Sequence, residues 1–461
     1  MRSCFVFAAC SLTLAFASVE GCSSSSSSGA SPADAGTPDA PTSDAGTPDA
    51  ASPADAATCG KLPPTGPTQV VTPSATADEE TGNEAKIVLD KKGRPVIAYL
   101  DHPASQTQAL YVVRWDDCAG SWRAPQKVDD SIDGSVGKAS RVFGLAVDSS
   151  DGRIAVAYQK IVHLVTPPRQ NDTAATFVAI SSDDGATFTS QRISHHDCET
   201  STSTEGDINN VSEPNVALAG GKTYVAYVQQ YHACAGTSPC SAAVVVSSAT
   251  GSTFAETLLP DSTDTQFGGH FIGRGFPLGL AVDSSGKVGV VAHREPPTAY
   301  DTVVGFWRAG DADVQVVTRS GTVQNDDGAA SLVFDGVKPR IVTRLQQGAF
   351  GATTDYDLTF STSDGASSTS AWTTIPLPRP EAIQPTENIL FAGGKIVVTA
   401  GGPHVFRSTD LATFAVDDLG LAQTSNGVGG TLDASGKLWA VVEGVTPAAA
   451  SLGGVVFYRE P

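Results

Sequence analysis

Short apolar segments recur along this chain in pairs, and a turn of Asp, Ser or Gly, usually with a Lys or Arg, separates the two members. The stretch "LAVDSSDGRIAVAY", residues 145–158, shows the pattern clearly. Two apolar segments around such a turn predict a β-hairpin. The pattern occurs seven times, at residues 88–99, 145–158, 218–227, 280–293, 332–344, 390–400 and 432–443. Its irregular spacing of roughly 40 to 70 residues is in the range of propeller repeats.

A third apolar segment follows each hairpin, and a fourth follows in six of the seven units. Four antiparallel strands per unit are typical of a propeller blade. The seventh unit ends without its fourth strand, but "TQVVTP" (68–73) precedes the first hairpin and resembles the missing one. Closing the ring with this segment would leave no unpaired edge across the last blade. We therefore predict an all-β propeller of seven four-stranded blades, closed by an N-terminal strand, with six blades as the alternative.

The composition agrees with many short strands and limits the partners. The chain has 461 residues, of which 40% are hydrophobic and 17% charged, with 46 Gly and 28 Pro, a balance that favours strands and turns. It has 29 Lys and Arg against 49 Asp and Glu, for a net charge of −20. Such a surface should repel nucleic acid and anionic lipid headgroups, so neither is an expected partner.

The N-terminus predicts export. Residues 1–21 have one Arg followed by a short apolar run, which is typical of a signal peptide. "SVEGC" (18–22) resembles a bacterial lipobox, which implies a lipid on Cys22; ordinary signal-peptidase cleavage is the alternative. Residues 22–66 are rich in Ser, Ala, Pro and Asp and predict a disordered tether, followed by the propeller domain at 67–461. A lipidated Cys before such a stalk resembles surface lipoproteins of Gram-negative bacteria, which implies an outer-membrane or cell-surface location.

The stretch "SSDDGATF" (181–188) joins the expected third and fourth strands of the second unit. It resembles the Asp-box, S-x-D-x-G-x-T-[WF], of sialidases (neuraminidases) and related β-propellers, with Ser181, Asp183, Gly185, Thr187 and Phe188 at the motif positions. Degenerate copies lie at 247–254 and 408–414. In that family the box is a structural turn on the propeller rim, so the resemblance implies a fold and not a chemistry. We expect its acid to bond the N–H groups of the turn and its Phe to pack between neighbouring sheets.

We expect the ligand-binding site on the face opposite these turns. On that face, the loops that join strands two and three lie beside the loops that lead to the next blade. The longest and most polar connections fall there. A sialidase needs three arginines for the substrate carboxylate, a Tyr–Glu pair and an Asp. The candidates are Arg274, Arg294 and Arg344, with Tyr231 and Glu295; further groups on this face are Arg141, Asp101, Glu213, Glu443, Tyr99 and Tyr300. The F-R-I-P motif of that family is absent, "GRGFP" (273–277) is only distantly similar, and surface ion pairs are the alternative role for each Arg.

Histidine, cysteine and acidic residues in the loops could form a metal-binding site. His195, His196 and His232 are candidate metal ligands, but their spacing matches no zinc signature, and an exported protein favours disulfides over thiolates. Acidic loops such as "DDSID" (129–133) or "STDTQ" (262–266) are weak candidates for Ca²⁺. We expect no cofactor otherwise. A Cys59–Cys118 disulfide would fasten the ring closure, whereas Cys234 and Cys240 can pair with each other or either can take Cys198.

Three functions are compatible with these features. The preferred one is a tethered, monomeric propeller that binds an extracellular glycan or protein on its loop-rich channel face, with the lipid anchor as its contact with the membrane. The second is an exo-sialidase-like glycoside hydrolase, and the third is a structural envelope component. The sequence leaves open whether the protein is an enzyme.

Overall fold

The computed structural model describes residues 59–461 with gaps, and all regular structure in the described part is β. The described ranges are 59–71, 80–102, 108–132, 143–163, 173–194, 214–231, 241–259, 279–294, 303–319, 329–347, 355–365, 370–378, 388–399, 404–420, 428–445 and 452–461. No helix in these ranges is long and apolar enough to cross a membrane.

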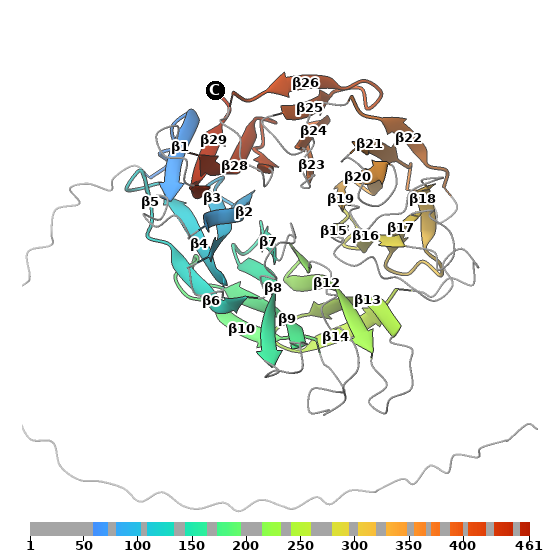
Figure 1. Ribbon diagram of the computed structural model, residues 1–461, viewed down its shortest axis with the longest axis horizontal. Helices are drawn as coiled ribbons and strands as arrows, with labels where there is room; N and C mark the ends of the chain where they lie inside the picture. The colour runs from blue at the N-terminus through green and yellow to red at the C-terminus, as the bar shows by residue number, and fades with distance from the viewer. Residues whose placement is uncertain are drawn as a thin grey trace, which may run out of the picture. The chain divides into compact units, whose positions relative to one another are not determined.

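The strands form seven antiparallel blades arranged in a ring (Figure 1), as the sequence predicted. Blade 1 has β2 (Glu80–Leu89), β3 (Pro95–His102), β4 (Gln108–Asp116) and β6 (Gln126–Ile132), with the short β5 (Ser121–Trp122) beside β4. Blade 2 has β7 (Phe143–Val147), β8 (Ile154–His163), β9 (Thr173–Ser181) and β10 (Thr189–Arg192). Blade 3 has β11 (Asn215–Ala219), β12 (Lys222–Tyr231), β13 (Ser241–Ala249) and β14 (Phe254–Leu258). Blade 4 has β15 (Gly279–Val282), β16 (Val288–Arg294), β17 (Val303–Arg308) and β18 (Gln315–Arg319).

The remaining three blades repeat the same order from the centre outward. Blade 5 has β19 (Ala329–Asp335), β20 (Lys338–Gln347), β21 (Asp355–Thr362) and β22 (Thr373–Pro376). Blade 6 has β23 (Asn388–Ala392), β24 (Lys395–Thr399), β25 (His404–Ser408) and β26 (Ala415–Asp418). Blade 7 has β27 (Val428–Leu432), β28 (Leu438–Val445), β29 (Leu452–Arg459) and, as its outermost strand, β1 (Gly66–Val71).

The ring closes through β1, which pairs antiparallel with β29. The register joins Gly66 to Arg459, Thr68 to Phe457 and Gln69 to Val456, with an irregularity before Val71. The strand needed to complete the last blade therefore comes from the start of the domain, as predicted. It covers the edge that β29 would otherwise expose.

Blades 1 and 2 are joined more closely than the sequence suggested. The fourth strand of blade 1 was expected at 123–129, but β6 reaches Ile132 and pairs there with Lys160 of β8, which connects the two blades into one nine-stranded sheet. Side chains join the same two strands, since the Lys160 ammonium lies 3.0 Å from the Asp129 carboxylate of β6. That ion pair reinforces the contact between the end of β6 and the neighbouring blade.

The core consists of apolar layers between consecutive blades. Alternate residues of a second strand point to opposite sides of the sheet. In β16, for example, Val290 packs toward blade 3 and Val291 toward blade 5, and neither is exposed. Each fully buried side chain of this kind contributes about 1.5–3 kcal/mol relative to an exposed one. The layers therefore hold the blades in their angular positions.

Glycine permits the inner strands to approach one another closely. Each of the seven inner strands contacts the inner strands of both neighbouring blades. A Cβ added to Gly429 of β27 would lie 2.5 Å from the Ala85 carbonyl oxygen of β2, and one added to Gly144 of β7 would lie 2.8 Å from the backbone N of Val216. Any larger residue would push these strands apart, so both glycines determine how tightly the ring closes.

Candidate functional site

The two faces of the propeller carry very different connections. Strands one and two of a blade are joined by short turns, such as residues 220–221, 336–337 and 393–394. The connections between strands two and three, and from strand four to the next blade, leave from the opposite ends of the strands. The longest segments of the ring, 193–214 and 259–278, are of this second kind. We call the first side the turn face and the second the loop face.

Several of the sequence candidates belong to strand ends on the loop face. Backbone pairing places Arg294 at the last position of β16, opposite Val303, and Tyr231 at the last position of β12, opposite Ser241. Arg344 lies in β20, three positions before the end of that strand. Their backbones thus approach the same face from blades 3, 4 and 5.

Three more candidates lie within described strands, Tyr99 and Asp101 in β3 and Glu443 in β28, and Tyr99 is buried. The remaining candidates fall in segments that the structure does not describe. These are Cys22, Arg141, His195, His196, Cys198, Glu213, His232, Cys234, Cys240, Arg274, Glu295 and Tyr300.

The turn at 181–188 has the hydrogen bonds expected from its composition. The Asp183 carboxylate accepts from the Thr187 backbone N–H at 2.9 Å and from the Thr187 hydroxyl at 2.5 Å, and the Ser181 hydroxyl accepts from the Gly185 N–H at 2.8 Å. The Thr187 hydroxyl, followed by the Thr187 N–H and the Ser181 hydroxyl, lowers the pKa of Asp183 to about 2. Phe188 packs against the apolar layer between blades 1 and 2. The turn therefore stabilises the fold locally.

The partial copy at 408–414 in blade 6 makes an equivalent turn. The Asp410 carboxylate accepts from the backbone N–H groups of Thr413 at 2.8 Å and Ala412 at 2.9 Å, and from the Thr413 hydroxyl at 2.7 Å. The Thr413 and Ala412 N–H groups hold the Asp410 pKa well below its usual value. Leu411 takes the positive φ of 60° that Asp184 takes, at 66°, in the first turn. Two turns of the same construction thus lie on the same face.

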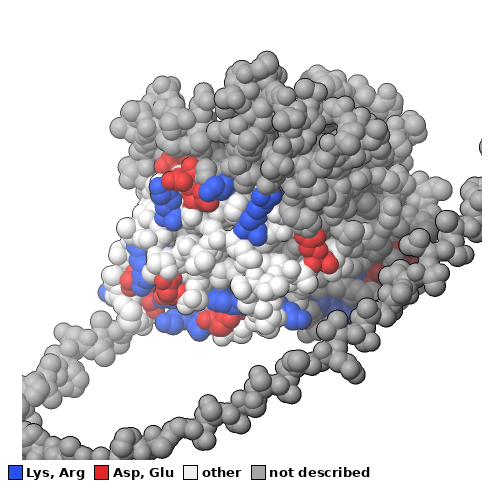
Figure 2. Space-filling model, turned by 90° about the horizontal axis from the view of Figure 1, so that it is seen from below, with Lys and Arg blue, Asp and Glu red and all other residues white. Residues whose placement is uncertain are grey.

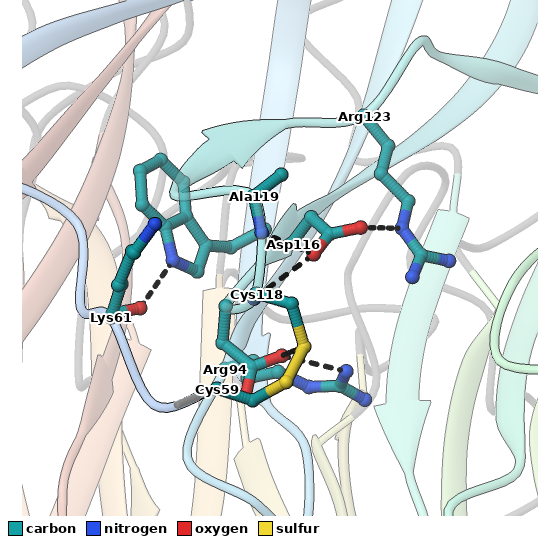
Figure 3. The surroundings of a disulfide bond; sticks show 9 residues. Cys59, Lys61, Arg94, Asp116, Cys118, Ala119 and Arg123 are labelled. Atoms are coloured by element: carbon teal, nitrogen blue, oxygen red, sulfur yellow. Dashed lines mark hydrogen bonds and ion pairs between the residues drawn. A yellow bond between two sulfur atoms is a disulfide. The ribbon is translucent and has the colours of Figure 1, made fainter. Parts of the chain in front are cut away.

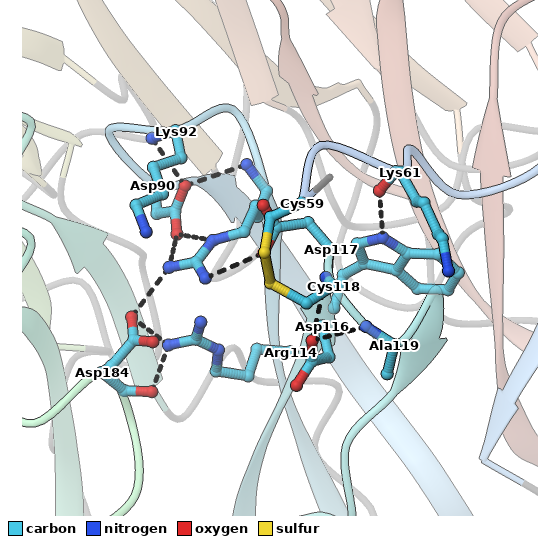
Figure 4. Close-up of polar contacts among 12 residues, drawn as sticks. Cys59, Lys61, Asp90, Lys92, Arg114, Asp116, Asp117, Cys118, Ala119 and Asp184 are labelled. Atoms are coloured by element: carbon cyan, nitrogen blue, oxygen red, sulfur yellow. Dashed lines mark hydrogen bonds and ion pairs between the residues drawn. A yellow bond between two sulfur atoms is a disulfide. The ribbon is translucent and has the colours of Figure 1, made fainter. Parts of the chain in front are cut away.

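Three arginines, Arg94, Arg114 and Arg123, gather around the carboxylate of Asp184, next to Asp183 in the first turn. Figure 4 shows Arg114 pointing toward Asp184. Arg94 Nη2 lies 2.8 Å from Asp184 Oδ1, Arg114 Nη1 contacts the same oxygen, and Arg123 Nη1 lies 3.9 Å from Oδ2. Burial acts to raise the Asp184 pKa, but the bonds and charges of Arg114 and Arg94 outweigh it, so the pKa is lowered. The cluster fastens blade 2 to blade 1.

The two inner arginines of this cluster are deeply buried. The side chain of Arg94 is 8% exposed and also bonds Asp90 at 2.6 Å and Asp117 at 3.4 Å. The side chain of Arg114 is 4% exposed, and its Nε and Nη2 have no hydrogen-bond partner among the described residues. An arginine trio around a carboxylate is thus present, but the carboxylate is the protein's own and the trio lies on the turn face. It cannot hold the carboxylate of a ligand while Asp184 occupies it.

A covalent link lies beside this cluster, where Cys59 and Cys118 form a disulfide (Figure 3). Asp116, Asp117 and Cys118 are the one group among the described residues whose ligand atoms are close enough for a metal ion. Their atoms already have other partners. Cys118 is in the disulfide, and Asp116 accepts from the N–H groups of Cys118 and Ala119, each at 3.0 Å. Arg123 also donates to Asp116, at 3.1 Å. The group is a capped turn rather than a metal centre.

Among the described residues, two tyrosine–carboxylate pairs are joined by hydrogen bonds, and both are internal. The Tyr158 hydroxyl donates to Asp129 at 2.8 Å and lies 2.9 Å from the Ser190 hydroxyl, and the Tyr227 hydroxyl donates to Glu256 at 3.0 Å. Neither tyrosine is exposed. Burial, together with Asp129, raises the pKa of Tyr158 well above its usual value. Both tyrosines connect a second strand to outer strands, and neither can reach a ligand as a nucleophile.

Residues 129–132, the described part of the acidic stretch 129–133, are strand rather than loop, and the second calcium candidate, 262–266, lies outside the described residues. Asp129 and Asp130 belong to β6. Burial acts to raise the Asp129 pKa, yet its bonds to Tyr158 and Lys160 lower it overall, while Asp130 pairs with Lys127 at 3.2 Å. These carboxylates have cationic partners and are therefore not free ligands for Ca²⁺. Acidic and basic side chains also lie close together elsewhere. Figure 2 shows Lys and Arg interspersed among Asp and Glu over the described surface in view.

No family model matches this chain, and no curated protein matches its sequence. Among solved structures, the α-L-arabinanase of Penicillium chrysogenum complexed with arabinobiose is 16% identical, with 77% of this chain and 99% of that chain covered and a TM-score of 0.43. The α-L-arabinofuranosidase of Fusarium graminearum with arabinobiose is 13% identical, with 86% and 97% covered and a TM-score of 0.47. The Trypanosoma rangeli sialidase with the inhibitor DANA is 14% identical, with 74% and 56% covered and a TM-score of 0.42. Likeness at this level carries no conclusion about the activity of this chain.

Proposed function

We propose that this protein is an exported, lipid-anchored β-propeller that binds an extracellular ligand, a glycan or a protein, on its loop face. The observation that supports the proposal is the difference between the two faces. Long connections on a rigid scaffold are where recognition residues concentrate. The ring offers its longest connections, 193–214 and 259–278, on the loop face alone.

Several carboxylates on the turn face already have internal partners. The carboxylates of Asp183, Asp410 and Asp116 bond their own turns, and Asp184 is held by arginines. A ligand binding there would compete with these internal partners and would lose the energy of breaking them.

The net charge and the types of residue on the loop face indicate the chemical class of the ligand. With a net charge of −20, the chain favours a neutral or cationic ligand over a polyanion. Tyr231, Arg294 and Arg344 come to the loop face on separate blades, and their types suit a sugar: a phenol ring stacks on a pyranose face, and guanidinium groups donate to hydroxyls. We therefore place a neutral glycan first and a protein partner second.

The binding test uses the secreted chain on an immobilised panel of neutral and sialylated glycans, followed by calorimetry with any glycan retained. Arg294→Ala and Tyr231→Ala should each weaken binding at least about tenfold, or about 1.4 kcal/mol. The matched control is Arg153→Ala on the turn face, where Arg153 pairs with Asp148 at 3.2 Å and Asp151 at 2.7 Å. Binding that survives both loop-face changes, or that Arg153→Ala abolishes, would contradict the proposal.

A parallel assay separates binding from hydrolysis. Release of fluorophore from a sialoside, lost in Arg274→Ala and Arg294→Ala, would replace the binding proposal with the hydrolase alternative. No turnover across a panel of glycosides, together with glycan retention, supports binding. Labelling with a radioactive fatty acid tests the anchor separately: the wild type should incorporate it and Cys22→Ala should not.

A further inference from the structure

The closing strand β1 is paired with β29 in a geometry that a pulling force can open pair by pair. Because β1 runs antiparallel to β29, the start of β1 at Gly66 lies opposite Arg459, near the end of the chain. A pull on the residues before Gly66 would therefore open the β1–β29 pairs one after another from this end. Sequential opening loads one hydrogen-bonded pair at a time, whereas shear loads all of them together. A short strand in this geometry offers little resistance.

The residues before β1 are fastened elsewhere, on blade 1 (Figure 3). Cys59 is bonded to Cys118, in the turn between β4 and β5. The backbone N–H groups of Gly60 and Lys61 donate to the Asp117 carbonyl at 3.3 and 3.0 Å, and the Trp115 indole N–H donates to the Lys61 carbonyl at 2.6 Å. The chain thus contacts blade 1 before it reaches its strand position in blade 7.

Both ends of β1 therefore lead into blade 1. Its C-terminal end continues through residues 72–79 into β2, and its N-terminal end reaches β4 through the disulfide. The closed covalent loop runs from Cys59 to Cys118 and contains β1 to β4. A pull that enters through the disulfide therefore loads blade 1 directly, and it loads β1 only once blade 1 separates from blade 7. That interface is an apolar layer in which Ile97 and Val113 of blade 1 pack with Val441 and Phe457 of blade 7, all with at most 1% exposure.

We propose that the Cys59–Cys118 disulfide is a mechanical bypass: it carries tension from the N-terminal segment into blade 1 and keeps the closing strand paired while the chain is pulled. Its role in the cell rests on the anchoring part of the proposed function, since a lipid at Cys22 would apply such tension when a bound ligand moves. The bypass itself needs neither a lipid nor a ligand.

The test is force spectroscopy on the secreted chain, with one handle at residue 23 and the other at Pro461. Wild type should resist until the ring breaks. In the Cys59→Ser/Cys118→Ser variant, an early step at lower force should appear first, when residues 59–79 leave the ring. Its length should be about 70 Å, from roughly 3.5 Å for each released residue. The later events, which report the rest of the ring, should be unchanged.

Two controls make the result specific. Trp115→Phe keeps the disulfide and removes the indole bond to Lys61, so it should behave as wild type. Wild type that is folded first and then treated with a reductant in the instrument should gain the early step, which covers the case in which the double variant folds poorly. Identical traces for oxidised wild type, reduced wild type and the double variant would overturn the proposal. Absence of a glycan or protein ligand would leave these traces untouched, so the two proposals fail separately.

Discussion

Replacing Asp184 by Asn should destabilise the propeller, because it leaves a buried guanidinium without its carboxylate. Asn is the suitable substitute, since Asp184 has a φ of 66° and Asn is one of the few residues that tolerate this conformation. Arg94 would still pair with Asp90 and Asp117. Arg114 would lose the only carboxylate within ion-pair distance in the described structure, and an Arg cannot deprotonate to escape burial.

The expected loss follows from burial on the two sides of the pair. Removing one partner of a fully buried ion pair costs about 3–5 kcal/mol. Arg114 is 4% exposed, but Asp184 is 47% exposed, and its backbone carbonyl would still accept from Arg114. Water therefore screens the interaction from one side, and we expect a loss of about 2 kcal/mol in the free energy of unfolding. Two pairing arginines lower the Asp184 pKa, so the contribution is complete above its unfolded pKa of about 3.9 and is lost as the pH falls through the lower folded pKa.

Urea unfolding at pH 7 and at pH 3 measures this loss, and a double-mutant cycle assigns it. Arg114→Met removes the charge and keeps an apolar side chain of similar length, so the Asp184→Asn/Arg114→Met pair should recover most of the loss. The matched control is Asp151→Asn, whose carboxylate is 43% exposed and whose partner Arg153 keeps Asp148; it should cost at most about 0.5 kcal/mol. Additive losses in the cycle, or equal losses for Asp184→Asn and Asp151→Asn, would refute the reasoning.

Three further outcomes are expected. Tyr158→Phe should cost about 1–2 kcal/mol in urea unfolding, because it removes a buried hydrogen bond to Asp129; no measurable loss would contradict the assigned bond. Gly429→Ala should weaken the closure of the ring, since its Cβ would meet the Ala85 carbonyl at 2.5 Å, and faster amide exchange in β27 and β2 would report it; unchanged exchange would disprove the close approach. The side-chain carboxyl signal of Asp183, followed by NMR, should titrate near pH 2, and an ordinary midpoint near 4 would show that its turn is not formed.

The blade count and the closure could be predicted from the sequence because both depend on local patterns. An apolar hairpin repeats seven times, and "TQVVTP" supplies the strand that the seventh unit lacks. The strand bounds of blade 1 were less predictable. The extension of β6 to Ile132 is accompanied by the pairing with Lys160 and by the Lys160–Asp129 ion pair, which join residues of different blades and leave no local mark in the sequence.

The arginine cluster was missed for a related reason. Arg94 follows the first hairpin turn, Arg114 lies in a third strand and Asp184 follows Asp183 in the turn at 181–188, so each residue had an adequate local interpretation. Only the packing of blade 2 on blade 1 brings them together. Arg114 stands between apolar residues in "YVVRW", and apolar residues follow Arg94 in "RPVIAY". A cation beside such a run was the available signal of a buried ion pair.

The backbone pairing between β6 and β8 means that the seven blades are not structurally equivalent. Replacing blade 1 or blade 2 alone would lose the backbone pairing between Ile132 and Lys160, whereas no such pairing crosses from blade 3 to blade 4 in the described residues. Duplication or exchange of a single unit should therefore be tolerated best far from the first two blades.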